Sequence, residues 1–126
     1  MPKRVLYGPG IVATSLPFSQ VVEAGGLVFL AGQVGDAPGD SGPVAGGIRA
    51  EARQMLENVG RLLRAVGLGY DDVVKATVYL RDFDEFAEMN EVYREFFPAE
   101  PPTRATVGVT RLALDYRVEI DVIAAR

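Results

Sequence analysis

The sequence predicts an α+β domain in which two amphipathic helices cover one face of a single mixed β-sheet. Apolar residues recur at three- and four-residue steps between residues 48 and 66, which is typical of a helix. Apolar and polar residues alternate over residues 73–80, which is the period of a strand. A second helical pattern and two further strand-like segments follow. The predicted order is therefore β-β-β-α-β-α-β-β, in one domain spanning residues 1–126.

Three short strands are predicted before the first helix. Residues 4–7 and 20–23 have strand-like composition, and residues 27–33 form the third candidate. The small residues at positions 24–26 are typical of a tight hairpin turn between the second and third strands. Residues 36–47 are rich in Gly, Pro, Asp and Ser, and we expect them to form an exposed loop.

The two predicted helices have recognisable ends. The first begins near Ile48 and ends at Gly67, because glycine is favoured just past a helix C-terminus. Asp82 and Glu85 resemble a capping box before the second helix, which Pro98 ends. Asn90 falls among apolar residues of this second helix. From its position alone it is equally consistent with a satisfied polar group and with a ligand contact.

The last two predicted strands, residues 104–109 and 117–124, carry the most informative polar residues. If they pair as an antiparallel hairpin, Arg104 and Thr106 lie near Glu119 and Asp121, on the sheet face opposite the helices. Alternation alone favours a surface ion pair between Arg104 and Glu119. The alternative is a functional site, because a guanidinium matches a carboxylate ligand and a nearby carboxylate can polarise a water.

Aromatic residues are also expected on the face opposite the helices. Alternation assigns to it either Phe29 and Ala31 or Val28 and Leu30, and Tyr79 joins them. An apolar sheet face is rarely left uncovered in a monomer, so we expect a second copy of the chain to cover it.

The composition restricts the chemistry that this chain can perform. Its 126 residues include neither Cys nor His, which excludes disulfides, thiol nucleophiles, Ser-His triads and ordinary zinc sites. The net charge of -4 argues against a nucleic-acid-binding face. We find no membrane-spanning apolar run and no signal-peptide pattern, and we expect a cytoplasmic protein without metal or cofactor.

Several segments together form a pattern that extends over nearly the whole chain. Near the C-terminus they are residues 102–107 (PTRATV), 111–112 (RL) and 118–120 (VEI). Earlier segments of the same pattern are residues 30–34, 47–48, 54–59, 74–80 and 86–97. This pattern resembles that of the RidA (YjgF) family of reactive-intermediate, or enamine/imine, deaminases.

The resemblance implies a chorismate-mutase-like fold and a homotrimer with three ligand sites in the clefts between subunits. The implied reaction is hydrolysis of a short-chain 2-imino acid, such as 2-iminobutanoate or 2-iminopropanoate, to the 2-keto acid and ammonia. Arg104 would bind the substrate carboxylate and Glu119 would position the attacking water. The other implied site residues are Phe18, Gly32, Asn90 and, through its backbone, Thr106.

Two positions depart from the family pattern and leave the identity of the imine open. Phe18 stands where archetypal deaminases have Tyr, so it can pack over a substrate but cannot donate a hydrogen bond. Thr106 stands where they have Cys. The alternative function is that of a non-catalytic sensor or regulator binding keto or imino acids in the same cleft. RNA cleavage, attributed to some family members, fits the acidic charge and the lack of His poorly.

Overall fold

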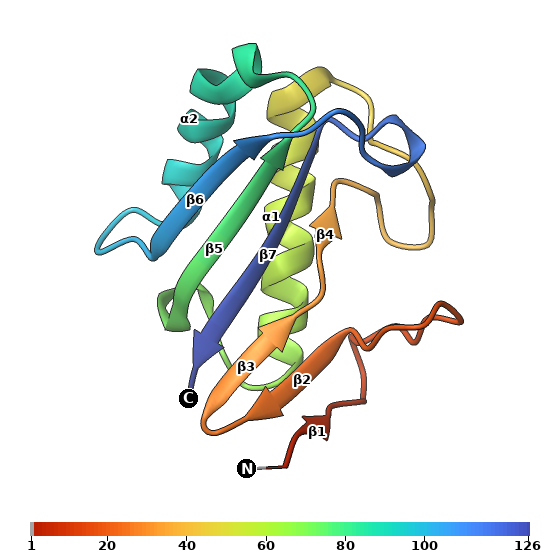
Figure 1. Ribbon diagram of the computed structural model, residues 1–126, viewed down its shortest axis with the longest axis vertical. Coiled ribbons are helices and arrows are strands. Elements are labelled where there is room, and N and C mark those ends of the chain that lie inside the picture. The colour runs from red at the N-terminus through yellow and green to blue at the C-terminus, as the bar shows by residue number, and fades with distance from the viewer. Residues whose placement is uncertain (1) are drawn as a thin grey trace.

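The computed structural model describes residues 2–126, which form one mixed sheet with two α-helices against one face (Figure 1). The strand order is β1-β2-β3-β7-β5-β6, and β4 pairs with β7 beyond the end of β3. The strands are β1 (Arg4–Val5), β2 (Val21–Ala24), β3 (Leu27–Leu30), β4 (Gln33–Val34), β5 (Val73–Leu80), β6 (Thr103–Gly108) and β7 (Val118–Ala125). The helices are α1 (Gly47–Ala65) and α2 (Phe86–Phe96), with short 3-10 turns at Tyr70–Asp72, Phe83–Glu85 and Ala113–Asp115.

The strand predicted over residues 27–33 is divided in two. It forms β3 and β4, because the chain leaves the sheet at Ala31 and Gly32 and then pairs farther along β7. The predicted hairpin turn before β3 is confirmed, since Gly25 and Gly26 have φ values of 59° and 78°. The break after β3 brings the backbone of Gly32 close to the middle of the sheet.

Helix α1 lies behind β7 and β4 in Figure 1 and provides much of the core. Its apolar stripe is fully buried and packs against α2 and the sheet. The stripe consists of Ala52, Met55, Leu56, Val59 and Leu63, each with no exposed surface. Within residues 2–126, no helix is both long and apolar enough to cross a membrane.

One carboxylate of α1 is buried and fixes the start of β7. Oε2 of Glu51 accepts hydrogen bonds from the backbone N–H groups of Arg117, at 2.6 Å, and Val118, at 3.2 Å. Burial raises the pKa of Glu51, and the two backbone donors oppose that rise. Gly35 is pressed against the same residue, since a Cβ at this position would lie 2.6 Å from its Cγ. Glu51 therefore anchors the strand that carries Glu119.

The predicted capping box before α2 is wrong in part. Asp82 does cap the preceding 3-10 turn, by accepting a hydrogen bond from the N–H of Asp84 at 3.0 Å. The Glu85 carboxylate does not return to Asp82, because it pairs with the Arg117 guanidinium at 2.8 Å. A long-range ion pair with Arg117 therefore replaces the local hydrogen bond from Glu85 that the spacing suggested.

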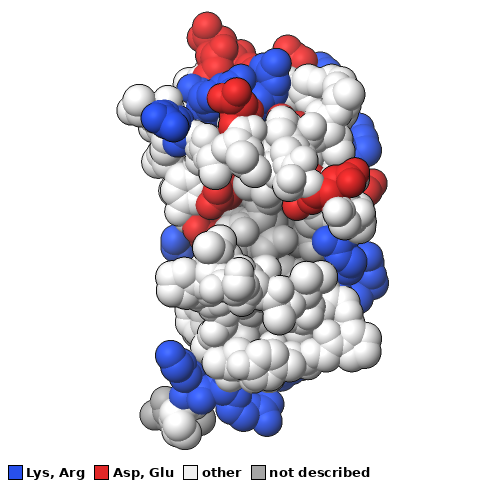
Figure 2. Space-filling model, turned by 90° about the vertical axis from the view of Figure 1, so that its right-hand side faces the viewer, with Lys and Arg blue, Asp and Glu red and all other residues white. Residues whose placement is uncertain are grey.

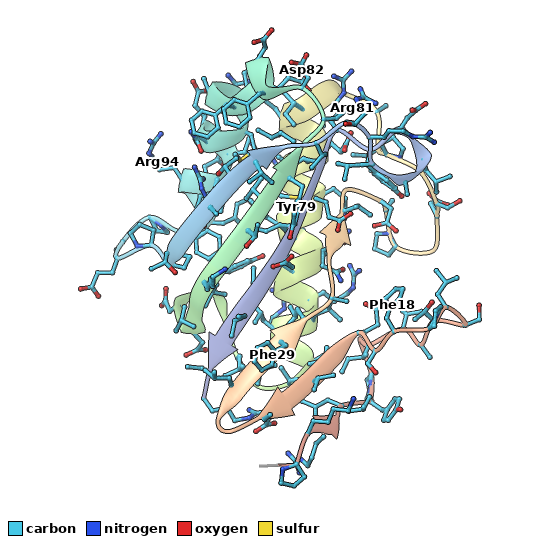
Figure 3. The ribbon with its side chains drawn as sticks, viewed as in Figure 1. Phe18, Phe29, Tyr79, Arg81, Asp82 and Arg94 are labelled. Atoms are coloured by element: carbon cyan, nitrogen blue, oxygen red, sulfur yellow. The ribbon has the colours of Figure 1, made fainter. Side chains whose placement is uncertain are left out.

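The face of the sheet opposite the helices carries aromatic side chains, as predicted. Figure 3 shows Phe29 and Tyr79 on the side of the sheet away from α1. Phe29 is 38% exposed, whereas its neighbours Val28 and Leu30 are buried in the core. Alternation had left two choices for β3, and packing against the helices selects Phe29 for the open face.

The predicted pairing of the last two strands is wrong. β5 lies between them, pairing in parallel with β6 and antiparallel with β7. The connection from β6 to β7 passes over the end of β5 and does not form a hairpin (Figure 1). In this register Arg104 is level with the core residue Ala76, whereas Glu119 is level with Tyr79 of the open face. Arg104 and Glu119 of one chain therefore lie on opposite faces of the sheet.

Candidate functional site

Arg104 projects from β6 toward α2, where two aromatic rings hold its guanidinium. The guanidinium carbon lies 4.6 Å from the ring centroid of Tyr93 and 5.7 Å from that of Phe86. Both distances are within the range of a cation–π interaction. Beside the guanidinium is a pocket of about 250 Å³ between α2 and β6. Its lining residues are Asn90, Tyr93, Arg94, Phe97, Pro101, Pro102 and Arg104.

The polar groups in this pocket lack partners within residues 2–126. Arg104 forms no ion pair with a described carboxylate. The buried Oδ1 atom of Asn90 and the buried hydroxyl of Tyr93 likewise have no partner in the described chain. Buried polar groups normally have partners, so this combination is suited to a small ligand with an anionic group and a hydrogen-bond donor.

The backbone of β6 adds polar groups at the same edge. Val109 donates its N–H to the carbonyl of Leu80 at 2.9 Å. By alternation, Val107 and Ala105 also direct their backbone N–H and C=O groups toward β5. Arg104 and Thr106 are in the other set, so their N–H and C=O groups face the free edge of the sheet. Thr106 can therefore offer a backbone contact to a ligand, whatever its side chain does.

Glu119 lies on the open face, next to Gly32. A Cβ atom at Gly32 would collide with the Glu119 carboxylate, whose Cδ would be 3.1 Å away. Only a glycine leaves room for the carboxylate in this position. Burial raises the pKa of Glu119, and the negative charge of Asp121 raises it further. Glu119 accepts no hydrogen bond from any residue of the described chain, so its oxygens are available to a water.

Two further residues on the open face form part of the electrostatic environment of Glu119. Tyr79 is level with Glu119 across β5 and β7, and its hydroxyl donates a hydrogen bond of 2.8 Å to Oδ2 of Asp121. That hydrogen bond raises the pKa of Tyr79, and burial adds to the effect. The hydroxyl is thus held by Asp121 and leaves Glu119 unpaired. Tyr79 was predicted on this face, but no role was assigned to it.

Replacing Asp121 with Asn should shift the acidic limb of the pH–activity profile to lower pH. The negative charge of Asp121 raises the pKa of Glu119, so its removal lowers that pKa toward the ordinary value. A carboxylate that activates water is lost as the pH falls through its pKa, so the loss should then occur at a lower pH. The measurement is kcat/KM as a function of pH for the imine hydrolysis that the family resemblance implies. Asn keeps the acceptor for Tyr79.

The matched control is Asp71→Asn, which removes one exposed carboxylate before β5. It changes the net charge equally but should leave the profile in place, since Asp71 does not act on Glu119. An unchanged profile in Asp121→Asn would contradict the assignment of Glu119 as the titrating group.

Phe18 lies apart from both groups of residues. It is 50% exposed and lines a small pocket of about 110 Å³ formed by residues 5–20. In Figure 3 it lies on the N-terminal segment, at the opposite side of the molecule from Arg94 of α2. Figure 2 shows a largely uncharged surface on the middle of this side. The exposed apolar residues of the N-terminal segment include Tyr7, Val12 and Leu16.

Within one chain, the predicted site residues therefore lie in separate groups. Arg104 and Asn90 share the pocket at β6 and α2, whereas Gly32 and Glu119 meet on the open face. The prediction missed the pocket residues Tyr93 and Arg94. Their spacing from Asn90, three and four residues along a helix, is the signal that could have identified them.

Comparisons with known proteins find relatives that span nearly the whole chain. The sequence profile of a family described as Endoribonuclease L-PSP matches residues 11–126. A RutC family protein of Pyrococcus horikoshii is 45% identical over 122 residues, which cover 97% of each chain. A Dermatophagoides farinae protein named 2-iminobutanoate/2-iminopropanoate deaminase is 39% identical over 122 residues, covering 97% of this chain and 95% of the relative. The crystal structure of E. coli TdcF with bound serine is 36% identical, with a TM-score of 0.88 and 98% of each chain covered.

Proposed function

Because the chain belongs to the RidA/YjgF/RutC family, we propose that it hydrolyses short-chain 2-imino acids, or their enamine tautomers, to 2-keto acids and ammonia. The observation that carries the proposal is the unpaired Arg104 guanidinium beside the unpartnered Oδ1 atom of Asn90. The named deaminase at 39% identity supports the same reaction class.

In the proposed complex the substrate carboxylate binds Arg104, which Tyr93 and Phe86 hold in place. A guanidinium can form two parallel hydrogen bonds to a carboxylate, which also fixes the orientation of the carbon next to it. The iminium N–H donates to Oδ1 of Asn90, and the free backbone of Thr106 provides a further polar contact. The electrophilic carbon is thereby held in one orientation for attack.

Glu119 then takes a proton from the attacking water as its oxygen bonds to the imine carbon. The C=N double bond becomes a single bond, and the product of this step is a carbinolamine. Glu119 returns the proton to the nitrogen, the C–N bond breaks and ammonia leaves. The carbinolamine hydroxyl gives its proton to Glu119 as the carbonyl of the keto acid forms, and this proton then passes to the released ammonia. Such proton transfers contribute roughly 100- to 10,000-fold to a rate. The raised pKa of Glu119 suits both accepting and returning the proton.

A second copy of the chain completes this site, in a homotrimer with the sites between subunits. Arg104 and Glu119 face opposite sides of one sheet, with β5 between their strands, so a single chain cannot place both on one substrate. We infer that the Arg104 pocket of one protomer meets Glu119 and Gly32 of its neighbour. Association also covers the open face that carries Phe29, and Phe18 packs over the substrate without donating a hydrogen bond.

The direct test is to generate 2-iminopropanoate or 2-iminobutanoate in situ with an amino-acid oxidase and to follow ammonia and keto-acid release. We expect acceleration in proportion to the protein added, and a solution mass three times that of the chain. An unchanged rate would contradict the enzymatic function. Pyruvate binding without acceleration would instead indicate a sensor, and a monomer would remove the inter-subunit site.

A further inference from the structure

The pocket that holds Arg104 is bordered by a second guanidinium, that of Arg94. Its seven lining residues include two arginines and no acidic residue. Glu100 and Asp71 belong to a neighbouring pocket, which shares Phe97 and Pro102 with this one. The Arg104 pocket therefore has more positive charge than one substrate carboxylate requires.

The carboxylates of α2 that could neutralise Arg94 are bound elsewhere. Glu91 pairs with Arg49 of α1 at 2.6 Å, and Glu95 pairs with Arg53 of α1 at 2.8 Å. These ion pairs direct the acidic side of α2 toward α1, away from the pocket. Within residues 2–126 Arg94 has no ion pair, so its charge is available to an anion.

A purely structural role for Arg94 would be to stabilise the C-terminal end of α2. A cation in the last turn of a helix interacts favourably with the helix dipole, and Arg64 has this position in α1. That role does not depend on the pocket, however, and Arg64 lines no part of it. Arg64 is therefore a matched reference, because it shares the helix position of Arg94 and lacks its access to the Arg104 pocket.

We propose that Arg94 is a specificity-determining residue that binds the side-chain carboxylate of dicarboxylic 2-imino acids, the imines of acidic amino acids. This inference rests on the proposed deaminase function and names the substrate class. Arg104 binds the carboxylate next to the imine carbon, and Arg94 binds the second carboxylate along the pocket. The volume of about 250 Å³ is below the roughly 300–1,000 Å³ of drug-sized sites, which suits a small acid.

The test compares kcat/KM for the imines of glutamate and alanine, both generated in situ by oxidases. The wild-type protein should prefer the glutamate imine, and Arg94→Gln should lower the ratio of the two kcat/KM values by roughly tenfold. Arg64→Gln removes the same charge and should leave both values unchanged. Arg94 is exposed, so its variant should keep the wild-type Tm and oligomer mass.

An unchanged ratio in Arg94→Gln would overturn the inference while leaving the deaminase function intact. If the protein does not accelerate the hydrolysis of any imine over the rate in buffer, the deaminase function is contradicted. Calorimetry with 2-oxoglutarate and pyruvate then tests the role of Arg94 separately. In that experiment Arg94→Gln should weaken 2-oxoglutarate binding relative to pyruvate binding by about the same factor. Equal weakening for both keto acids, or none, would contradict the role of Arg94.

Discussion

Glu119→Gln is expected to lower kcat for imine hydrolysis by roughly 100- to 10,000-fold, which is the usual contribution of a general base. Gln has nearly the same shape and so preserves the packing against Gly32, but it cannot take a proton from water. Binding of the keto-acid product should remain, because Arg104 is unchanged. Steady-state kinetics and calorimetry with pyruvate measure the two quantities separately.

Glu57→Gln is a suitable control, since it removes a carboxylate from the exposed side of α1 and should leave kcat unaffected. A Glu119→Gln variant with wild-type kcat would exclude this residue as the group that activates water. A variant that lost keto-acid binding as well would indicate that Glu119 shapes the pocket instead.

Arg104→Ala is expected to lower kcat/KM by roughly 100-fold, because truncating one partner of a desolvated charge pair costs about 3 kcal/mol. In contrast to Glu119→Gln, this change should also abolish pyruvate binding, because it removes the guanidinium that binds the carboxylate next to the reacting carbon. Arg104→Lys should recover only part of the loss, because an ammonium cannot form the same bidentate contact or stack on Tyr93 as well. Full activity in Arg104→Ala would exclude its role in carboxylate binding.

The two inactive variants together test whether the site lies between subunits. When Arg104→Ala and Glu119→Gln chains are unfolded, mixed equally and refolded, about one quarter of the sites should combine an intact Arg104 with an intact Glu119 from a neighbour. About one quarter of the wild-type activity should return. If both residues acted within one chain, every site would carry one of the two changes, and mixing would restore nothing.

The local elements of this protein could be predicted well from its sequence. The three- and four-residue spacing of α1 and the alternation in β5 depend on residues close together in the chain, and both elements occur where expected. The open face with Phe29 and Tyr79 follows from the same alternation once β3 is packed against the helices. Asn90 was a candidate because it is a polar group among apolar helix residues; within residues 2–126 its buried Oδ1 atom has no partner, and its role as a ligand contact stays a prediction.

The grouping of the site residues could not be predicted in this way. Alternation places Arg104 and Ala105 on opposite faces of β6, but it does not say which face meets the helices. A short connection suggested a hairpin, and the actual neighbour of β6 is β5, so the prediction put Arg104 on the wrong face. Tyr93 is buried in the core, and its ring also lies against the guanidinium of Arg104, a contact that the spacing of one helix does not reveal.

The sequence by itself determined the chemical groups available: no Cys, no His, and an Arg and a Glu on separate strands. Side-chain identity and local periodicity are properties of short segments, and they survive in any tertiary arrangement. Only the tertiary structure decided that Arg104 joins Asn90 and Arg94 in one pocket, while Glu119 joins Gly32 on the other face. The strand order, and the sheet face on which each side chain lies, are set by the burial of the apolar rows against α1 and α2. This burial involves residues that are far apart in the chain.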